Sequence, residues 1–222
     1  MKKLDWYFDF ISPYSYLQNA VLDRVAPHAE IRRRPVFFGG LLNHWGHLGP
    51  AEIPPKREWT FRHCVWLAHR HGIALTMPTM HPFNPLPLLR LSIAEGNSPD
   101  VVDRLFRYVW VDGHVPSDQN AWLALLDERG VAEAALNADA VKNALRANGA
   151  DALAAGVFGV PTAVVEGQTF WGFEATDMLL DYLNDGAVFA SGEMKQANRL
   201  PSGPGRPQAV RQPLHPTDPS RP

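Results

Sequence analysis

The segment Phe8–Tyr16 restricts the fold of this chain more than any other stretch of the sequence. The aromatic-rich run Leu4–Phe10, which leads into it, is typical of a strand. Ser12 then has the residue type of a helix N-cap, and Pro13 suits the first helical position. A helix that begins directly after a strand presents free backbone N–H groups and a partial positive charge. The junction is therefore a natural seat for an anion, including a thiolate.

The residue types at this junction exclude disulfide chemistry. Ser12 and Ser15 stand where a redox protein of similar layout would carry its two cysteines. Cys64 is the only cysteine in the chain, so neither an intrachain disulfide nor a Cys-x-x-Cys motif is available. Cys64 falls on an apolar helix face and is expected to be buried. Two interpretations of Ser12 stay open. It either caps the helix, which would stabilise the helix by about 1 kcal/mol, or its hydroxyl donates a hydrogen bond to a bound thiolate.

The first part of the chain has the pattern strand, helix, strand. Leu17, Val21 and Val25 repeat every four residues and predict one buried helix face. A second strand is expected at Ile31–Phe38. Pro35 lacks an N–H donor, so it fits only the end or the edge of a sheet. The glycines and prolines at residues 39–40 and 46–55 indicate loops.

A block of helices follows. The expected helices lie at 60–71, at 86–95, and after the predicted caps Ser98, Ser117 and Asn137. The first of them is expected to bury Phe61, Cys64, Val65 and Ala68. Its histidines do not have the spacing of a zinc helix, so no metal site is predicted. Tryptophans 45, 59 and 66 could line an aromatic pocket, but packing in the core or between domains is the favoured interpretation.

β character returns near residue 162. The segments 162–166 and 169–171 flank a turn that contains Gly167, which is a hairpin signal. A closing helix is expected at 175–184. The order βαβ, helical block, ββα predicts a mixed α/β sheet with a helical insertion. The proline-rich tail at 199–222 is expected to be disordered.

Composition limits the possible partners. The chain has 222 residues and a net charge of −2, so charge gives no reason to expect binding to nucleic acid or to an anionic membrane. No apolar run approaches the roughly 18 residues that span a bilayer. Lys2 and Lys3 precede a strand-like run and not a signal-peptide core. A cytoplasmic location is expected.

A second motif, Gly156–Thr162, contains a Val160-Pro161 bond just before a strand. Such a bond is usually trans and without a special role, since about one X–Pro bond in twenty is cis in folded proteins. A cis Pro161 would turn the backbone N–H and C=O of Val160 outward, where they could pair with a peptide-like ligand.

These features together resemble the thioredoxin-like superfamily and, within it, the kappa-class glutathione transferases and the glutathione-dependent 2-hydroxychromene-2-carboxylate isomerases. The resemblance rests on FDFISPYSYL, GVFGVPT and WGFEATDML and spans about residues 4–185. It implies an α/β, thioredoxin-like fold with an inserted all-helical domain. The implied boundaries are 1–40 and 136–198 for the thioredoxin-like domain, 41–135 for the insertion and 199–222 for the tail.

The resemblance also implies roles for individual residues. Ser12 would donate a hydrogen bond to the glutathione sulfur, and Val160, beside Pro161, would bind the cysteinyl part through its backbone. Lys56 resembles a lysine that meets a glutathione carboxylate; without the resemblance, it would be a solvated charge at a helix start. Phe173 and Glu174 match the segment that meets the γ-glutamyl group, with Glu174 where the family usually has aspartate. That segment also suits a plain helix start.

Substrate-binding positions agree less well with the isomerases. They usually carry a lysine where this chain has Asn43, and an Asn-Arg pair where it has Ala51-Glu52. Asn84 matches a substrate-contacting asparagine, although it also suits a proline-bounded turn before a helix. These departures put the substrate in question, whereas the fold does not depend on them.

The sequence thus predicts a glutathione-dependent isomerase that acts on a chromene-type or other aromatic carboxylate, with glutathione as cofactor. Relatives imply a homodimer. One alternative is a kappa-class-like glutathione transferase or peroxidase, which would consume glutathione. Another is a non-catalytic thioredoxin-like module that binds thiols or peptides.

Overall fold

The computed structural model describes residues 1–203, which fall in two compact units, Met1–Asp185 and the chain from Gly186 onward. The second unit contains a 3-10 helix η4 (Ala187–Ala190) and helix α9 (Gly192–Ala197), whose N-cap is Ser191. Most of the tail predicted at 199–222 lies outside the described residues. The predicted domain boundaries stay a prediction. The first unit contains the sheet and the candidate site.

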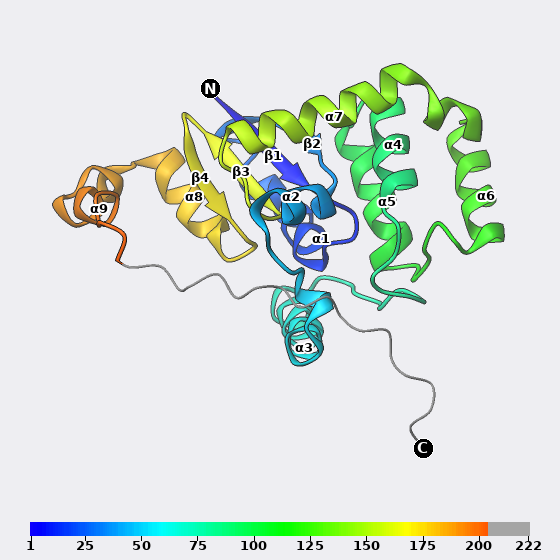
Figure 1. Ribbon diagram of the computed structural model, residues 1–222, viewed down its shortest axis with the longest axis horizontal. Coiled ribbons are helices and arrows are strands. Elements are labelled where there is room, and N and C mark those ends of the chain that lie inside the picture. Colours follow the sequence, from blue (N-terminus) through cyan, green and yellow to red (C-terminus); the bar gives the residue numbers. More distant parts are fainter. Residues whose placement is uncertain (204–222) are drawn as a thin grey trace. The chain divides into compact units, whose positions relative to one another are not determined.

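A four-stranded sheet of order β2-β1-β3-β4 forms the centre of this unit (Figure 1). Its strands are β1 (Lys2–Phe8), β2 (Ala29–Pro35), β3 (Thr162–Val165) and β4 (Gln168–Trp171). β1 runs parallel to β2 and antiparallel to β3, where Trp6 pairs with Ala163. β3 and β4 form the expected hairpin. The prediction of a mixed sheet with Pro35 at the end of an edge strand is confirmed.

The connection from β1 to β2 differs from the prediction in its helix. Helix α1 covers only Pro13–Asn19, and a 3-10 helix η1 (Leu22–Arg24) follows it. The change from α to 3-10 geometry turns Leu22 and Val25 into the core and leaves Val21 half-buried. The continuous helix expected through Val25 is therefore wrong, because tertiary packing set the phase of this segment.

The inserted block is helical, as predicted. Its elements are α2 (Phe38–Trp45), η2 (Pro50–Glu52), α3 (Pro54–His71), α4 (Leu86–Ala94), α5 (Pro99–Trp110), α6 (Gln119–Arg129) and η3 (Glu133–Asn137). Helix α7 (Asp139–Ala154) then returns across the block toward β3 (Figure 1). Helix α8 (Ala175–Asn184) closes the unit.

Several local predictions within this block are wrong. The glycines at 39–40 lie inside α2, because neighbouring side chains bury its other face. Ser117 and Asn137 are not caps: the N-cap positions are Asp118 and Ala138. Asn137 instead accepts a hydrogen bond from Arg90 at 3.0 Å. The predicted cap Ser98 does accept from the Val101 N–H.

Helix α3 and its tryptophans also depart from the prediction. Its buried face is formed by Thr60, Cys64, Leu67 and Ala68, whereas Val65 is exposed. Trp45, Trp59 and Trp66 are 43%, 56% and 55% exposed, so none of them is a core residue, and packing between domains stays a prediction. The indole of Trp45 still donates to the Val157 carbonyl at 3.0 Å and ties α2 to the chain before β3.

An aromatic cluster joins the sheet to the helical block. Phe106 of α5 lies between Phe8, Phe10 and Tyr16, with ring centroids 4.7 Å apart for Phe10 and 5.6 Å for Phe8. All four side chains are buried. The indole of Trp110 donates to the Phe10 carbonyl at 2.9 Å. Burial of such large rings contributes strongly to stability, so this cluster anchors the insertion on β1.

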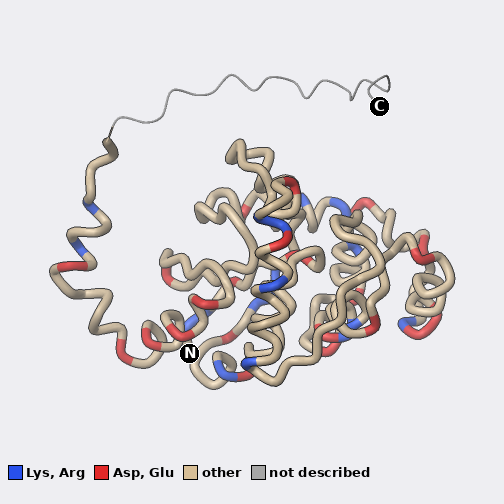
Figure 2. The backbone as a smooth tube through the Cα atoms, turned by 90° about the horizontal axis from the view of Figure 1, so that it is seen from below, with Lys and Arg blue, Asp and Glu red and all other residues tan. Residues whose placement is uncertain are grey.

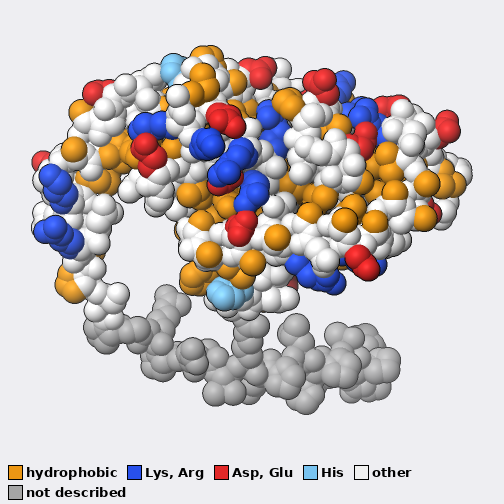
Figure 3. All heavy atoms as spheres, turned by 90° about the horizontal axis from the view of Figure 1, so that it is seen from above, with side chains coloured by type: hydrophobic (Ala, Val, Ile, Leu, Met, Phe, Trp, Pro, Cys, Tyr) orange, Lys and Arg blue, Asp and Glu red, His pale blue; other side chains and the backbone are white. Residues whose placement is uncertain are grey.

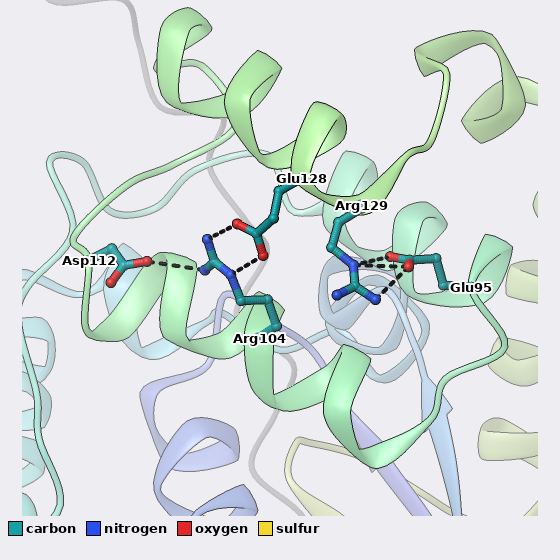
Figure 4. A network of polar contacts seen from close by, with 5 residues as sticks. All are labelled: Glu95, Arg104, Asp112, Glu128 and Arg129. Carbon is teal, nitrogen blue, oxygen red and sulfur yellow. Dashed lines mark hydrogen bonds and ion pairs between the residues drawn. The ribbon is translucent and has the colours of Figure 1, made fainter.

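Ion pairs hold the outer helices together (Figure 4). Arg104 of α5 binds Glu128 of α6 through two hydrogen bonds of 2.7 Å and also pairs with Asp112. Arg129 also forms a bidentate pair, with Glu95 at the end of α4, through bonds to both carboxylate oxygens. The hydrogen bond from Arg104 lowers the pKa of Glu128. Paired planar groups of this kind are the stronger form of surface ion pair.

Within residues 1–203, no helix is long and apolar enough to cross a membrane. Basic and acidic residues are scattered along the backbone (Figure 2), and the face in Figure 3 mixes both signs with hydrophobic side chains.

Replacing Phe106 tests the anchoring role of the aromatic cluster. Phe106→Ala should lower the free energy of unfolding by about 3–5 kcal/mol, because it empties a fully buried site among other rings. Urea unfolding measures the change. Leu123→Ala on exposed α6 is the control and should change stability by less than about 1 kcal/mol. A loss for Phe106→Ala no larger than that of the control would contradict the role.

Candidate functional site

Two distant segments meet at Ser12. Its hydroxyl accepts the N–H of Ser15 at 3.2 Å, which is the predicted cap, and donates to the Val160 carbonyl at 3.4 Å. Ser12 is 7% exposed, and so is Val160. The bond to Val160 is longer than a normal O–H···O hydrogen bond. The proton of Ser12 can therefore turn to a stronger acceptor at little cost.

The backbone of Val160 has one free donor. The Val160-Pro161 bond is cis, and the Val160 carbonyl faces Ser12 and not solvent. Within residues 1–203, no hydrogen bond to the Val160 N–H is found. The Thr162 hydroxyl and the Gly172 N–H satisfy the carbonyls on either side of it. This leaves the Val160 N–H as a donor for the carbonyl of an extended ligand.

The other predicted glutathione contacts lie in the first turn of α3 and just before α8. Lys56 is exposed in the first turn of α3. Phe173 is 6% exposed and packs edge-on against His71. Glu174 precedes α8, and its carboxylate oxygen lies 3.9 Å from Nε2 of His63.

The predicted substrate residues are not brought into contact with Ser12. Asn43 is exposed near the end of α2. The side chain of Asn84 accepts a hydrogen bond from the Leu86 N–H at 3.1 Å. Asn84 therefore has the predicted structural role in the turn before α4. Both lie in segments that follow β2, and the described residues show no hydrogen bond from either to the Ser12 junction.

Sequence reasoning missed a chain of polar contacts from Glu174 to the first turn of α1. The Tyr14 hydroxyl is 2.9 Å from Nδ1 of His63, whose other ring nitrogen faces Glu174. Burial raises the pKa of Tyr14, so this phenol stays protonated at neutral pH. Tyr14 lies two residues after Ser12, and it therefore links the Glu174 end of the site to the serine.

Aromatic rings extend this side of the site along α3. Trp59 stacks on His63 with centroids 4.6 Å apart, and Trp66 lies almost parallel to His63 at 6.0 Å. The spacing of 59, 63 and 66 on one helix face was the available sequence signal. Cys64, on the other face, is fully buried, and burial raises its thiol pKa to about 12. It is an inert core residue, as expected.

Asp9 is a second residue that the sequence analysis did not single out. It is completely buried and accepts the Ile11 N–H at 3.2 Å and the Phe38 N–H at 2.8 Å. It thus fixes both the turn before Ser12 and the start of α2. Burial raises its pKa to about 7, although these N–H groups oppose the shift. The signal was a lone carboxylate within an aromatic run.

Metal chemistry has no visible support. Among the residues that the structure describes, no group of three or more His, Cys, Asp or Glu side chains could hold a metal ion.

Known proteins with similar sequences belong to the thioredoxin-like class that the geometry indicates. Residues 3–184 match the family model of a DSBA-like thioredoxin domain. A 2-hydroxychromene-2-carboxylate isomerase of Sphingobium xenophagum is 30% identical over an alignment of 199 residues that covers 83% of this chain and 99% of the relative. Glutathione S-transferase kappa 1 of Rattus norvegicus is 25% identical over an alignment of 203 residues that covers 81% of this chain and 89% of the relative.

Solved structures agree on the fold. A structure of 2-hydroxychromene-2-carboxylate isomerase superposes with a TM-score of 0.68 at 23% identity and covers 88% of this chain and 97% of that one. The cytosolic disulfide reductase DsbM of Pseudomonas aeruginosa, solved with GSH, gives 0.55 at 16% identity, with 89% and 100% covered. The predicted α/β thioredoxin-like fold with a helical insertion is confirmed.

The buried Asp9 should make stability depend on pH. Its folded pKa of about 7 exceeds the unfolded value of about 3.9, so the folded state holds a proton that the unfolded state has lost. Between these values stability should fall as pH rises, by up to about 1.4 kcal/mol per pH unit. Urea unfolding from pH 5 to 8 should show this slope in the wild type up to about pH 7, level off above it, and show no such slope in Asp9→Asn. Asp23→Asn, an exposed carboxylate, should keep it; equal slopes in all three proteins would refute the assignment.

Proposed function

This chain belongs to the DsbA-like thioredoxin family, and we propose that it is a glutathione-dependent isomerase of 2-hydroxychromene-2-carboxylate-type aromatic carboxylates. The observation that carries the proposal is the pairing of the Ser12 hydroxyl with the Val160 backbone on a scaffold without a cysteine pair. The relatives named as isomerases and as kappa glutathione transferases support it.

The site fits glutathione on observations of its own. The unpaired Val160 N–H can donate to the cysteinyl carbonyl, and the weakly engaged Ser12 proton can donate to the sulfur. Exposed Lys56 would meet the glycine carboxylate. Glu174, behind buried Phe173, would meet the γ-glutamyl ammonium. Two donors at the centre and opposite charges at the ends match this zwitterionic tripeptide.

Ser12 has a defined electrostatic task in this proposal. A free thiol with a pKa of about 8.5 is only roughly 3% thiolate at pH 7. Helix α1 has only seven residues, so its dipole is short and the hydroxyl must provide much of the stabilisation. Ser12 steadies the sulfur and forms no covalent bond.

Glutathione, when bound, supplies a thiolate that adds reversibly to an unsaturated carbon, so that the former double bond can rotate before the thiol leaves. Ser12 holds the sulfur at the end of β1 and stabilises its charge before addition and after release. The protonated Tyr14, fixed by His63, keeps a neutral donor two residues from Ser12. Buried Asp9 fixes the turn that aims Ser12.

The substrate side has an aromatic wall and few fixed polar groups. The exposed rings of Trp59 and Trp66 offer flat surfaces to an aromatic substrate. Asn43 and Asn84 are the proposed polar contacts to its carboxylate. Asn43 is neutral, and Ala51-Glu52 adds no positive charge. The proposed substrate class, an aromatic carboxylate with the hydroxychromene as its reference member, rests instead on the relatives that are named as isomerases.

A kappa-class-like transferase or peroxidase is the second candidate, since kappa relatives share this scaffold. It would consume thiol, whereas an isomerase returns it. A third candidate is a module that binds thiols or peptides without turnover. The expected homodimer and cytoplasmic location stay predictions.

Ser12→Ala tests the proposed role of the serine. Glutathione-dependent turnover of 2-hydroxychromene-2-carboxylate should fall about tenfold to a hundredfold, the value of a hydrogen bond to a charged atom. Total thiol should stay constant during wild-type turnover; thiol loss would favour the transferase. Ser15→Ala is the matched control, because the Ser15 hydroxyl is buried without a partner. Unchanged turnover in Ser12→Ala would refute the mechanism.

Glu174→Gln tests the proposed contact with the γ-glutamyl ammonium. The Kd of glutathione should rise about two- to fivefold, since the carboxylate is exposed and such pairs are weak. Calorimetry with glutaryl-Cys-Gly, which lacks the amino group, should show no difference between variant and wild type. Asp181→Asn on exposed α8 should leave both affinities unchanged. An equal loss for both ligands in Glu174→Gln would contradict the contact.

A further inference from the structure

A groove separate from the Ser12 site lies between α2, α4 and α7. Leu41, Leu86, Leu145 and Leu153 supply its apolar surface, and its volume is about 430 Å3. None of the proposed glutathione contacts lines it. The volume lies within the range of small-molecule sites and is small for a protein segment with its own secondary structure.

Three cations line this groove and no acidic residue does. They are Arg90 of α4 and Lys142 and Arg146 of α7. Most other arginines of the unit, such as Arg104 and Arg129, are paired with carboxylates. Within residues 1–203, none of the three groove cations takes part in an ion pair.

The neutral partners of these cations leave hydrogen-bonding capacity unused. Arg90 donates one bond to Asn137 at 3.0 Å, and its Nε is buried without a partner. Arg146 donates one bond to Asn143 at 2.7 Å. A guanidinium has five N–H donors, so both can still bind a carboxylate. Uncompensated positive charge beside an apolar surface favours an anion with an apolar body.

We propose that this groove binds a small amphipathic carboxylate. The acid would face Lys142 and Arg146, with Arg90 behind them, and the apolar body would lie on the four leucines. The site is distinct from the glutathione site, so the inference does not depend on the proposed function.

The charge of the groove favours a small anion over a segment of this chain. The chain beyond residue 198 carries four arginines and one aspartate, so its charge matches that of the groove and opposes binding there. A compact anion with an apolar body matches both the volume of the groove and its three cations.

Calorimetry with the full-length protein tests the proposal with three probes: decanoate, 2-naphthoate and decan-1-ol. At least one acid should bind, about tenfold or more tightly than the neutral alcohol, because the charge contact is lost in the alcohol. Whichever of the two acids binds more tightly shows whether the apolar body of the ligand is aliphatic or aromatic. No binding of either acid, or equal binding of the alcohol, would overturn the proposal.

Two variants locate the binding. Lys142→Gln with Arg146→Gln should weaken the acid about tenfold or more and leave decan-1-ol unchanged. Gly149→Phe should abolish binding of the acid, since Gly149 lines the groove and a Cβ there meets nothing within 4 Å. Ala147→Phe, exposed on the same helix, is the matched control. Saturating glutathione should not displace the acid; displacement, or wild-type affinity in both groove variants, would overturn the proposal.

Discussion

Complete burial of the face of strand β1 that carries Leu4, Trp6 and Phe8 is the constraint on which the rest of this structure depends. Leu4, Trp6 and Phe8 have no exposed surface, and the strand pairs with β2 on one side and β3 on the other. Since the aromatic residues of β1 must pack on the inserted helices, the end of the strand is held in place by α5. Ser12 lies just past that end, so its position is set by the core and not by a flexible loop.

The chemistry of the site follows from what this fixed end brings together. A serine hydroxyl, a free backbone N–H and a buried carboxylate meet where two chain segments converge. A thioredoxin-like scaffold with cysteines at this place would exchange disulfides. With Ser12 and Ser15 instead, no disulfide can form at this place, and the proposed function assigns to it the stabilisation of the sulfur of bound glutathione.

The two proposed ligand sites differ in physical character. The wall near Ser12 is aromatic and carries a Tyr14–His63–Glu174 contact chain, which suits a flat substrate beside a tripeptide. The groove on α7 is aliphatic and carries unpaired cations. α2 contributes to the groove through one face and carries Asn43 on another. Helix α3 of the insertion therefore supplies the aromatic wall, whereas α7, which follows the insertion, supplies most of the groove.

The sequence by itself determined the strand–helix junction, the Ser12 cap, the βαβ and ββα halves and the absence of disulfide chemistry, because these depend on neighbouring residues and on periodicity. It did not determine where α1 ends, that residues 39–40 are helical, or that Trp59 and Trp66 are exposed, since packing between distant segments decides these. The Ser12–Val160 contact, the burial of Asp9 and the link from Tyr14 through His63 to Glu174 join residues far apart in the chain. Only the tertiary structure could decide them, because hydrogen bonds across such separations leave no local pattern.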